Sequence, residues 1–538
     1  MPWLSFLTHT PFAATPGPSA ASALHAVGAP GEMLSLSTSL CAREDVADLE
    51  CDLSALCRDD GTALPDAAVD TFVVMVWEQA GVGVYQSAPQ RVPELLLKDD
   101  RSALRDGWRR GCGHWRHPWR SGRFYTPPAV RLHGPVRTSL VAGAAKQVWI
   151  AVRIPPHTPA GIYRGQLEVR ADGRPAAALA VAIEVLPLQL VVPPHDAFLW
   201  YRSTLDCRYP RNWVSERTMA GHFDDIAAHG FRSVSLAEGD PGLLQRALDL
   251  AHAAGLRRHV VLCAPFPRRW SGLAFRDLTP FYYVSDEADV RGPATLQQHV
   301  RNSLEARQRG VRTMCALTQE AASHRFLPGG DVGHAPDVFL YYLPRNRTYF
   351  AARSAFAAAR ARPAYYYWHS HMEKPLVHRV LAGLYLWKSG ADGIAPYCYQ
   401  DLPEPPNSPF DDFDEWDSSE RAVSGGHALK DHMTTYPARG GSIPTLQWKG
   451  LSAGLFDLAY LATVESLAQR AADRGGAAAD AARAARADID AFLAGVSLTH
   501  IQIDSDTETQ PYPHLRAEDL AAFRERLARA AVAIQALL

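Results

Sequence analysis

Hydrophobic and polar residues alternate with a period of two along much of residues 32–192. The alternation runs through residues 147–154 and 162–171, and it resumes at 179–185 after Asp172-Gly173, a pair that favours a hairpin turn. Successive side chains of a strand point to opposite faces, so each of these strands has one apolar face to bury. The pattern predicts an antiparallel β-sandwich over residues 32–192.

The segments on either side of this region have other patterns. Residues 1–31 are rich in Pro, Ala, Ser and Thr, which predicts an irregular lead-in. Pro193 and Pro194 end the sheet pattern, because proline cannot donate to a sheet ladder. Beyond them, apolar runs suited to buried strands alternate with segments of helical period. The runs lie at residues 198–201, 233–236, 259–263, 282–285, 312–317, 338–342, 364–368 and 393–399.

This alternation predicts a multidomain β plus α/β protein, in which a (β/α)8 TIM-like barrel at residues 193–470 follows the sandwich. The Ala-rich residues 471–538 predict C-terminal helices packed on the barrel. One barrel helix has clear ends, since Asp240-Pro241 is a favoured start and Gly255 a favoured end. A doubly wound open sheet is the main alternative, but no glycine-rich phosphate loop follows the first strand.

The fourth apolar run ends in a group of carboxylates. Ser285 is followed at once by Asp286 and Glu287, with Asp289 just beyond. The C-terminal strand ends of a parallel barrel open into its site, so the adjacent pair is a candidate acid/base centre. Helix capping is the alternative, because carboxylates are favoured in a first helical turn. We expect the capping role for Asp289.

Two adjacent carboxylates pose a geometric problem, because neighbours on a regular strand point to opposite faces. The backbone must leave β geometry if both are to face one site. Two close carboxylates then repel each other's ionisation, which leaves one protonated as an acid and the other anionic. Substrate-assisted glycosidases need this division, since the acid protonates the leaving group while the anion orients a nucleophilic acetamido group of the substrate. Glu287 is the expected acid/base and Asp286 the orienting group.

Aromatic and polar residues at the other strand ends suit a sugar, because rings stack on its C–H faces and polar groups bind its hydroxyls. Trp200, Tyr397 and Tyr399 would form the platform, and Arg202 and His371 would bind hydroxyls. A Pro-rich acidic loop beyond residue 402 would lie over the barrel mouth. The full set of candidate substrate-binding residues is Trp200, Tyr201, Arg202, Glu238, Glu320, His369, His371, Tyr397, Tyr399, Asp401 and Trp416.

His369, His371 and Glu373 have a spacing that places them on one face of a strand, as metal ligands could be. A metal-dependent hydrolase on a barrel usually gathers further His and Asp ligands from other strands, and the fifth, sixth and eighth runs end without His. We therefore predict no metal and no other cofactor, and we assign these residues to substrate hydrogen bonding or to structure.

Composition limits the classes of partner. A formal charge of −2 with 47% hydrophobic and 21% charged residues describes a globular protein and gives no reason to expect nucleic acid. The eight cysteines are scattered without a zinc or disulfide pattern. No signal peptide and no run of about 18 apolar residues is recognisable, which predicts a cytoplasmic protein without a membrane segment. Nothing in the sequence predicts its oligomeric state.

Five stretches resemble the proteins that carry the domain of unknown function 4091, whose characterised relatives include glycoside hydrolase family 123, the β-N-acetylgalactosaminidases. They are residues 92–96, 148–169, 283–287, 390–394 and 446–461. The sequence departs from the family pattern in the last stretch, where two Arg positions hold Gln447 and Ser452 and an acidic position holds Phe456. The resemblance implies a sandwich followed by a barrel, catalytic roles for Asp286 and Glu287, and an N-acetylhexosamine substrate.

The resulting hypothesis is an exo-acting glycoside hydrolase that cleaves a β-linked non-reducing-end sugar, N-acetylgalactosamine being the candidate, by a retaining substrate-assisted mechanism. A second hypothesis keeps Glu287 as the acid and uses Glu320 or Asp401 as nucleophile on a sugar without an N-acetyl group. The third is a carbohydrate-binding protein without activity.

Overall fold

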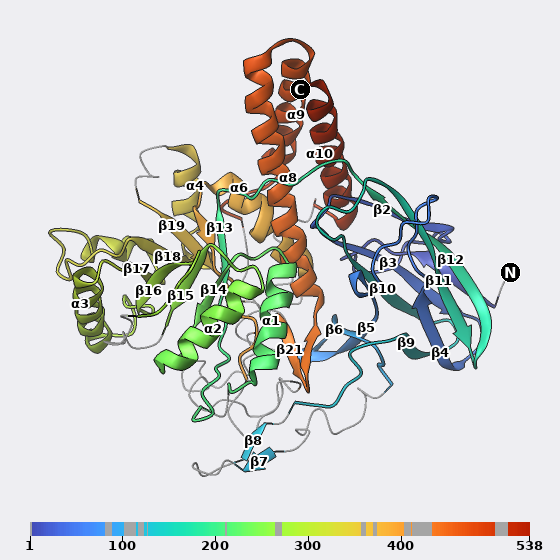
Figure 1. Cartoon of the computed structure of the whole chain (residues 1–538), viewed down its shortest axis with the longest axis horizontal. Coiled ribbons are helices and arrows are strands. Elements are labelled where there is room, and N and C mark those ends of the chain that lie inside the picture. The colour runs from blue at the N-terminus through green and yellow to red at the C-terminus, as the bar shows by residue number, and fades with distance from the viewer. Residues whose placement is uncertain are drawn as a thin grey trace.

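The computed structural model describes residues 3–80, 89–101, 114–116, 123–125, 127–209, 212–263, 272–356, 362–369, 374–402, 410, 433–500 and 515–538. Its N-terminal part contains two five-stranded sheets that pack face to face around a shared apolar core (Figure 1). One sheet has the order β1 (Leu4–Thr8), β3 (Met33–Ala42), β10 (Ala145–Arg153), β5 (Val69–Ala80) and β6 (Pro89–Leu97). The other has the order β2 (Ala23–Gly28), β12 (Arg174–Val185), β11 (Gly161–Ala171), β4 (Val46–Leu53) and β9 (Val136–Leu140).

Local signals account for parts of these sheets. The predicted turn at Asp172-Gly173 joins β11 to β12, and both of its residues have positive φ, 49° and 77°. β2 pairs with β12 in parallel, so this sheet is not purely antiparallel. The short 3-10 helix η1 (Asp66–Ala68) precedes β5, and β7 (His114–Arg116) pairs with β8 (Arg123–Tyr125) as a separate hairpin.

Eight parallel strands close into a barrel after residue 195. Every neighbouring pair is parallel, and the last strand pairs with the first. In order they are β13 (Asp196–Leu199), β14 (Ser233–Leu236), β15 (His259–Leu262), β16 (Thr279–Ser285), β17 (Arg312–Leu317), β18 (Val338–Tyr342), β19 (Ala364–Tyr367) and β20 (Gly393–Ile394).

Helices cover this barrel only in part. The α-helices are α1 (Glu216–Ala228), α2 (Pro241–Ala253), α3 (Pro293–Gln308), α4 (Arg347–Ala355), α5 (Pro375–Val380) and α6 (Leu386–Ser389). A π-helical turn, η5 (Leu381–Tyr385), joins α5 to α6, and the 3-10 helix η3 (Leu343–Arg345) precedes α4. As predicted, Asp240 caps α2 by accepting from the backbone N–H groups of Gly242 and Leu243, and Gly255 follows that helix at φ 92°.

The predicted fold class is wrong, because the described residues do not form the complete ring of helices that a (β/α)8 barrel requires. Among the described residues no helix connects β15 to β16, and only the 3-10 helix η2 (Glu320–Arg325) lies between β17 and β18. Pro328, Gly329, Gly330 and Gly333 follow η2, and such residues disfavour helix. The protein instead combines a closed, all-parallel eight-stranded barrel with antiparallel sheets and additional helices.

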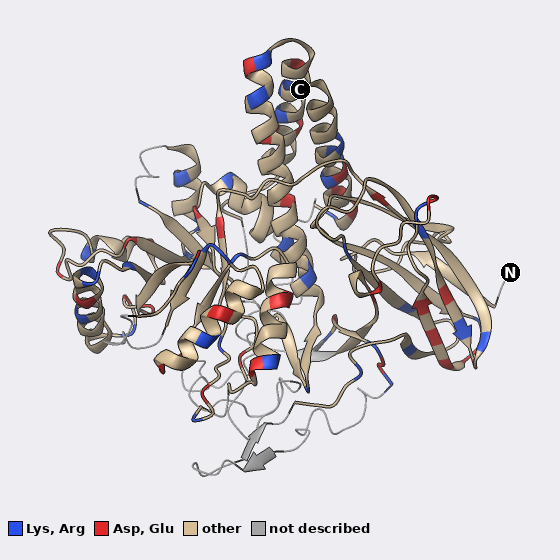
Figure 2. Cartoon of the chain, viewed as in Figure 1, with Lys and Arg blue, Asp and Glu red and all other residues tan. Residues whose placement is uncertain are grey.

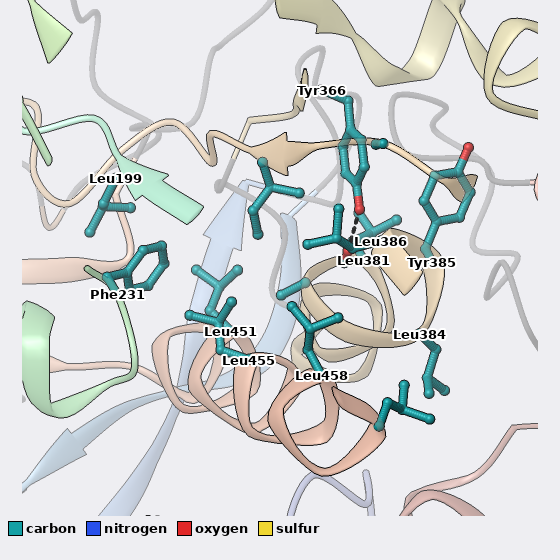
Figure 3. Packing of buried hydrophobic residues seen from close by; sticks show 14 of the residues in the cluster. Leu199, Phe231, Tyr366, Leu381, Leu384, Tyr385, Leu386, Leu451, Leu455 and Leu458 are labelled. Carbon is teal, nitrogen blue, oxygen red and sulfur yellow. Dashed lines mark hydrogen bonds between the residues drawn. The ribbon is translucent and has the colours of Figure 1, made fainter. Parts of the chain in front are cut away.

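The hairpin of β21 (Thr435–Ala438) and β22 (Gly441–Pro444) leads into the long helix α8 (Leu446–Arg474), which lies between the sandwich and the barrel (Figure 1). This helix is apolar and long enough to cross a membrane by length and composition, but 89% of its most apolar 18-residue window is buried inside the protein. Leu451, Leu455 and Leu458 face the turn that carries Leu381 and Leu384 (Figure 3). Helix α8 is therefore a core helix of this fold.

Helices α9 (Gly476–Ala494) and α10 (Ala517–Leu537) pack against α8 to form a three-helix bundle that projects from the molecule (Figure 1). Basic residues (Lys, Arg) and acidic residues (Asp, Glu) are interspersed along this bundle (Figure 2). Residues 1–31, which were expected to be irregular, contribute β1 and β2 to the two sheets. The boundaries predicted between the four segments of the chain remain a prediction.

A buried ionic network joins the sandwich to α5, α8 and α10. Asp457 accepts from Arg379 Nε (2.7 Å) and from Arg524 Nε (2.6 Å). Arg524 also contacts Glu32, next to β3, at 3.2 Å, and the Tyr460 hydroxyl donates to the same carboxylate at 2.6 Å. All five side chains are buried or nearly so, and the two guanidinium groups hold the pKa of Asp457 below its ordinary value despite that burial.

Candidate active site

Asp286 and Glu287 lie just beyond the C-terminal end of β16, where the backbone leaves β geometry. Glu287 has φ 43°, in the left-handed region that residues other than glycine rarely adopt. Its carbonyl oxygen accepts from Val290 N (3.0 Å) and Arg291 N (3.1 Å), which closes a tight turn. Neighbouring side chains of a regular strand point to opposite faces. After this turn the two neighbouring carboxylates lie on the same side, since both contact Arg291.

Two tyrosines from the barrel hold the carboxylates. The Tyr283 hydroxyl of β16 donates to Asp286 Oδ1 at 2.6 Å, and the Tyr367 hydroxyl of β19 donates to Glu287 Oε1 at 2.8 Å. Arg291 Nη2 lies 2.7 Å from Asp286 Oδ2 and 3.5 Å from Glu287 Oε2. Each carboxylate therefore has its own tyrosine, and the two share one cation.

The two carboxyl groups differ in environment. Glu287 is 25% exposed and Asp286 is 49% exposed. Burial raises the pKa of Glu287 and the charge of Asp286 raises it further, while the hydrogen bond from Tyr367 and the charge of Arg291 oppose the rise. A carboxyl whose pKa is raised toward neutrality suits a general acid.

An aromatic wall surrounds the pair at the mouth of the barrel. Trp200 projects into the inner core, with its ring 4.9 Å from Tyr283 and 6.2 Å from Tyr397 between centroids. On the other side, the Tyr342 ring lies 5.1 Å from Tyr367 and 5.2 Å from His369. The site therefore combines carboxylates with aromatic faces, as sugar binding requires.

Three of these aromatic residues were missed by the sequence reasoning, namely Tyr283, Tyr342 and Tyr367. Each lies on a strand at an even spacing from a residue of the inner core, since Tyr283 follows Phe281 by two positions and Tyr367 follows Tyr365 by two. The alternation of strand side chains could have identified them once the inward face of each strand was known.

Arg202 and Asp401 lie at the mouth near Tyr397. Arg202 Nε is 3.9 Å from Asp401 Oδ1, and the Tyr397 hydroxyl donates to Asp401 Oδ2 at 3.0 Å. The Arg202 side chain is 44% exposed. The arrangement offers a guanidinium and a carboxylate of the kind that bind sugar hydroxyls.

Four candidate residues do not reach this site. Tyr201 and Tyr399 point away from the barrel interior into the outer core, where their hydroxyls bond to His222 Nδ1 and Asp225 Oδ2, both at 3.0 Å. Tyr201 follows the inward Trp200 and so faces outward. β20 ends at Ile394, so strand alternation no longer places the residues that follow it.

Glu238 is buried and structural. It accepts from Thr204 Oγ1 (2.8 Å) and Leu205 N (2.6 Å), and these bonds attach the loop after β13 to the end of β14. Glu320 begins η2 and lines a separate cavity of about 730 Å³ together with Asn346 and Tyr349. Neither carboxylate has a described contact with Asp286 or Glu287.

Asp289 does not cap α3, contrary to expectation. It accepts from Thr318 N (3.0 Å), Thr318 Oγ1 (2.8 Å) and Gln319 N (2.9 Å). Helix α3 begins at Pro293 with Gly292 as its cap residue, without a side-chain cap. Asp289 instead ties the carboxylate-bearing turn to the end of β17, which helps to hold that turn in place.

Two candidate residues, His371 and Trp416, lie outside the described residues, and so does Glu373. Within the described part of the chain no group of three or more His, Cys, Asp or Glu side chains is placed to hold a metal ion.

Comparison with solved structures shows a likeness over the whole chain. A family 123 glycoside hydrolase from Clostridium perfringens, studied for its hydrolysis of glycolipid glycans, aligns with a TM-score of 0.65 at 12% identity, over 99% of this chain and 100% of that chain. A family 5 xyloglucanase from Bacteroides ovatus aligns with a TM-score of 0.25 at 9% identity, over 81% of this chain and 98% of that chain.

A family 99 endo-α-mannosidase from Bacteroides thetaiotaomicron aligns with a TM-score of 0.30 at 12% identity, over 51% of this chain and 99% of that chain. No family model matches the sequence, and no curated protein matches it. At this level of identity, the likeness shows that this chain shares the fold of the Clostridium perfringens enzyme.

Proposed function

We propose that this protein is an exo-acting glycoside hydrolase that removes a β-linked N-acetylhexosamine, with N-acetylgalactosamine as the first candidate, from the non-reducing end of a glycan. The observation that carries the proposal is the turn at Glu287, which directs two adjacent carboxylates toward one side at an aromatic barrel mouth. The glycoside hydrolase fold supports it, and so does the resemblance of residues 283–287 to the Asp-Glu strand of that family.

In this mechanism Glu287 protonates the glycosidic oxygen as the bond to the anomeric carbon breaks. Asp286 accepts a hydrogen bond from the acetamido N–H, and the acetamido carbonyl oxygen attacks the same carbon to form a cyclic intermediate. Glu287, now a carboxylate, then takes a proton from water as the water opens the ring. Two displacements at one carbon retain its configuration.

The other site residues would bind the sugar. Trp200 and Tyr397 supply aromatic faces, and Arg202 and Asp401 supply groups for hydroxyls. Asp401 is also the alternative nucleophile for a sugar without an N-acetyl group. Glu320, which lines a separate cavity, is less suited to that role.

A panel of aryl β-glycosides with and without the N-acetyl group tests the proposal. We expect turnover of the N-acetylated sugars with retained configuration, read by phenol release and by NMR of the first-formed anomer. Turnover of the other sugars alone would favour a protein nucleophile. Sugar-dependent thermal stabilisation without any turnover would indicate a binding protein and contradict the proposed activity.

Tyr367→Phe is expected to move the basic limb of the pH profile of kcat/KM to higher pH. The Tyr367 hydroxyl bonds to Glu287 Oε1 and so lowers the pKa of that carboxyl. Without this bond Glu287 keeps its proton to higher pH. Tyr342→Phe, which removes the hydroxyl from a neighbouring ring, should leave that limb in place. An unshifted limb in Tyr367→Phe would argue against Glu287 as the acid.

A further inference from the structure

The Asp286–Glu287 pair shares one cation unequally. Arg291 Nη2 is 2.7 Å from Asp286 Oδ2, a full ion-pair contact, but 3.5 Å from Glu287 Oε2. Arg291 lies in the segment between the carboxylates and α3, and its backbone N–H closes the turn on Glu287 O at 3.1 Å. The same residue therefore both completes the turn and brings a positive charge to the pair.

The hydrogen-bond donors are divided in the same unequal way. Within the described part of the chain, Asp286 has two close donors, the Tyr283 hydroxyl at 2.6 Å and Arg291 at 2.7 Å. Glu287 has one close donor among the same residues, the Tyr367 hydroxyl at 2.8 Å, and it is about half as exposed as Asp286. Donors and solvent favour the charged form of a carboxyl, so the negative charge belongs on Asp286 and the proton on Glu287.

We propose that Arg291 is a positioning residue that decides which carboxyl of the pair holds the proton, by keeping Asp286 anionic and leaving the proton on Glu287. The inference rests on the proposed function, in which these two states are the ones needed before substrate cleavage. Arg291 itself need not touch the substrate, because it acts through the two carboxylates.

Other ionisable groups around the pair come from several elements and do not replace Arg291. Among the residues that the structure describes, Arg291 is the cation that contacts both carboxylates. The other groups are Tyr283 on β16, Tyr367 on β19, Cys263 after β15, Cys315 on β17 and Asp289 in the same loop. The charge of Asp289 opposes ionisation of Glu287, and the thiols of Cys263 and Cys315 have pKa values raised to about 12 by burial, so they stay neutral.

The first test is the pH profile of kcat/KM for Arg291→Gln. A nearby cation favours the carboxylate form, so its removal makes the pair easier to protonate. We expect both limbs to move to higher pH, by about one unit for the acid limb and by less for the basic limb. Arg291→Lys keeps the positive charge, so the shift seen in Arg291→Gln should be at most half as large in this variant.

Arg309→Gln is the matched control. Arg309, just beyond α3, also pairs with a glutamate four positions before it, at 3.2 Å from Glu305 Oε1, but far from the two carboxylates in sequence. This variant should keep the wild-type profile. A fall in kcat/KM of Arg291→Gln that is equal at every pH, or an equal shift in Arg309→Gln, would overturn the inference.

The second test does not need turnover. Infrared absorption of the protonated Glu287 carboxyl, identified by its loss in Glu287→Gln, is titrated in the wild type and in Arg291→Gln. We expect a midpoint at higher pH in Arg291→Gln, and an unchanged midpoint would overturn the role of Arg291. A shifted midpoint in a protein that turns over no glycoside would support that role and count against the proposed hydrolase function.

Discussion

Glu287→Gln is expected to lower kcat/KM by about 10²- to 10⁴-fold, because the amide cannot deliver a proton to the glycosidic oxygen. The loss should increase with the pKa of the leaving phenol, since a poorer leaving group depends more on the acid. A series of aryl glycosides of one sugar with different phenols measures this dependence directly. The amide can still accept the hydrogen bond from Tyr367, so the melting temperature should hardly change.

Glu305→Gln provides the control for this experiment. Glu305 lies on α3 in an exposed ion pair with Arg309, and its loss should affect neither activity nor the dependence on the leaving group. Wild-type activity in Glu287→Gln would end the proposal of Glu287 as acid/base. A loss of activity accompanied by an equal loss of folded protein would also contradict it.

Asp457→Asn is expected to destabilise the folded protein by about 3–5 kcal/mol, because removing the charge of one partner leaves the other buried charge uncompensated. Asp457 is 3% exposed and neutralises part of the charge of two buried guanidinium groups, those of Arg379 and Arg524. The nearly isosteric amide keeps the volume but removes that charge. The midpoint of urea unfolding measures the effect.

Asp488→Asn is the matched comparison, because Asp488 forms an exposed ion pair with Arg526 at 3.0 Å. Exposed pairs of this kind contribute at most about 1 kcal/mol. If Asp457→Asn shifted the unfolding midpoint no more than Asp488→Asn does, the network would not be what fixes the sandwich and α10 to α8.

The candidate site could be predicted from the sequence where the chemistry is local. The apolar run that ends at Ser285 identified Asp286 and Glu287 as a pair just beyond a strand. Because adjacent residues of a strand point to opposite faces, a shared site for both carboxylates predicted that the backbone leaves β geometry there, as it does at Glu287. Asp240 as a helix cap is predictable for the same reason, since its partners are two and three residues away.

Other parts of the site depend on residues far apart in the chain. Tyr367 reaches Glu287 across 80 positions of sequence, and Asp289 was assigned to a helix start when its partners are at Thr318 and Gln319. Tyr399 was placed at the site as an aromatic residue at the end of the eighth apolar run, but the strand had already ended. A period of two holds only while the backbone remains extended.

The sequence by itself determined the approximate positions of the eight barrel strands, of several sandwich strands and of the carboxylate pair, because hydrophobic periodicity and turn residues act over a few positions. It did not reveal β1 and β2, which lie in residues 1–31, a segment expected to be irregular. Only the tertiary structure decided that the helices of the described segments cover the barrel incompletely and that α8 lies beside the sandwich. It also decided which tyrosine holds which carboxylate and where Arg291 lies. These features depend on packing between segments that are far apart in the sequence, which local patterns do not predict. One such contact is the close approach of Gly454 to the Arg379 carbonyl, which leaves no room for a Cβ at position 454.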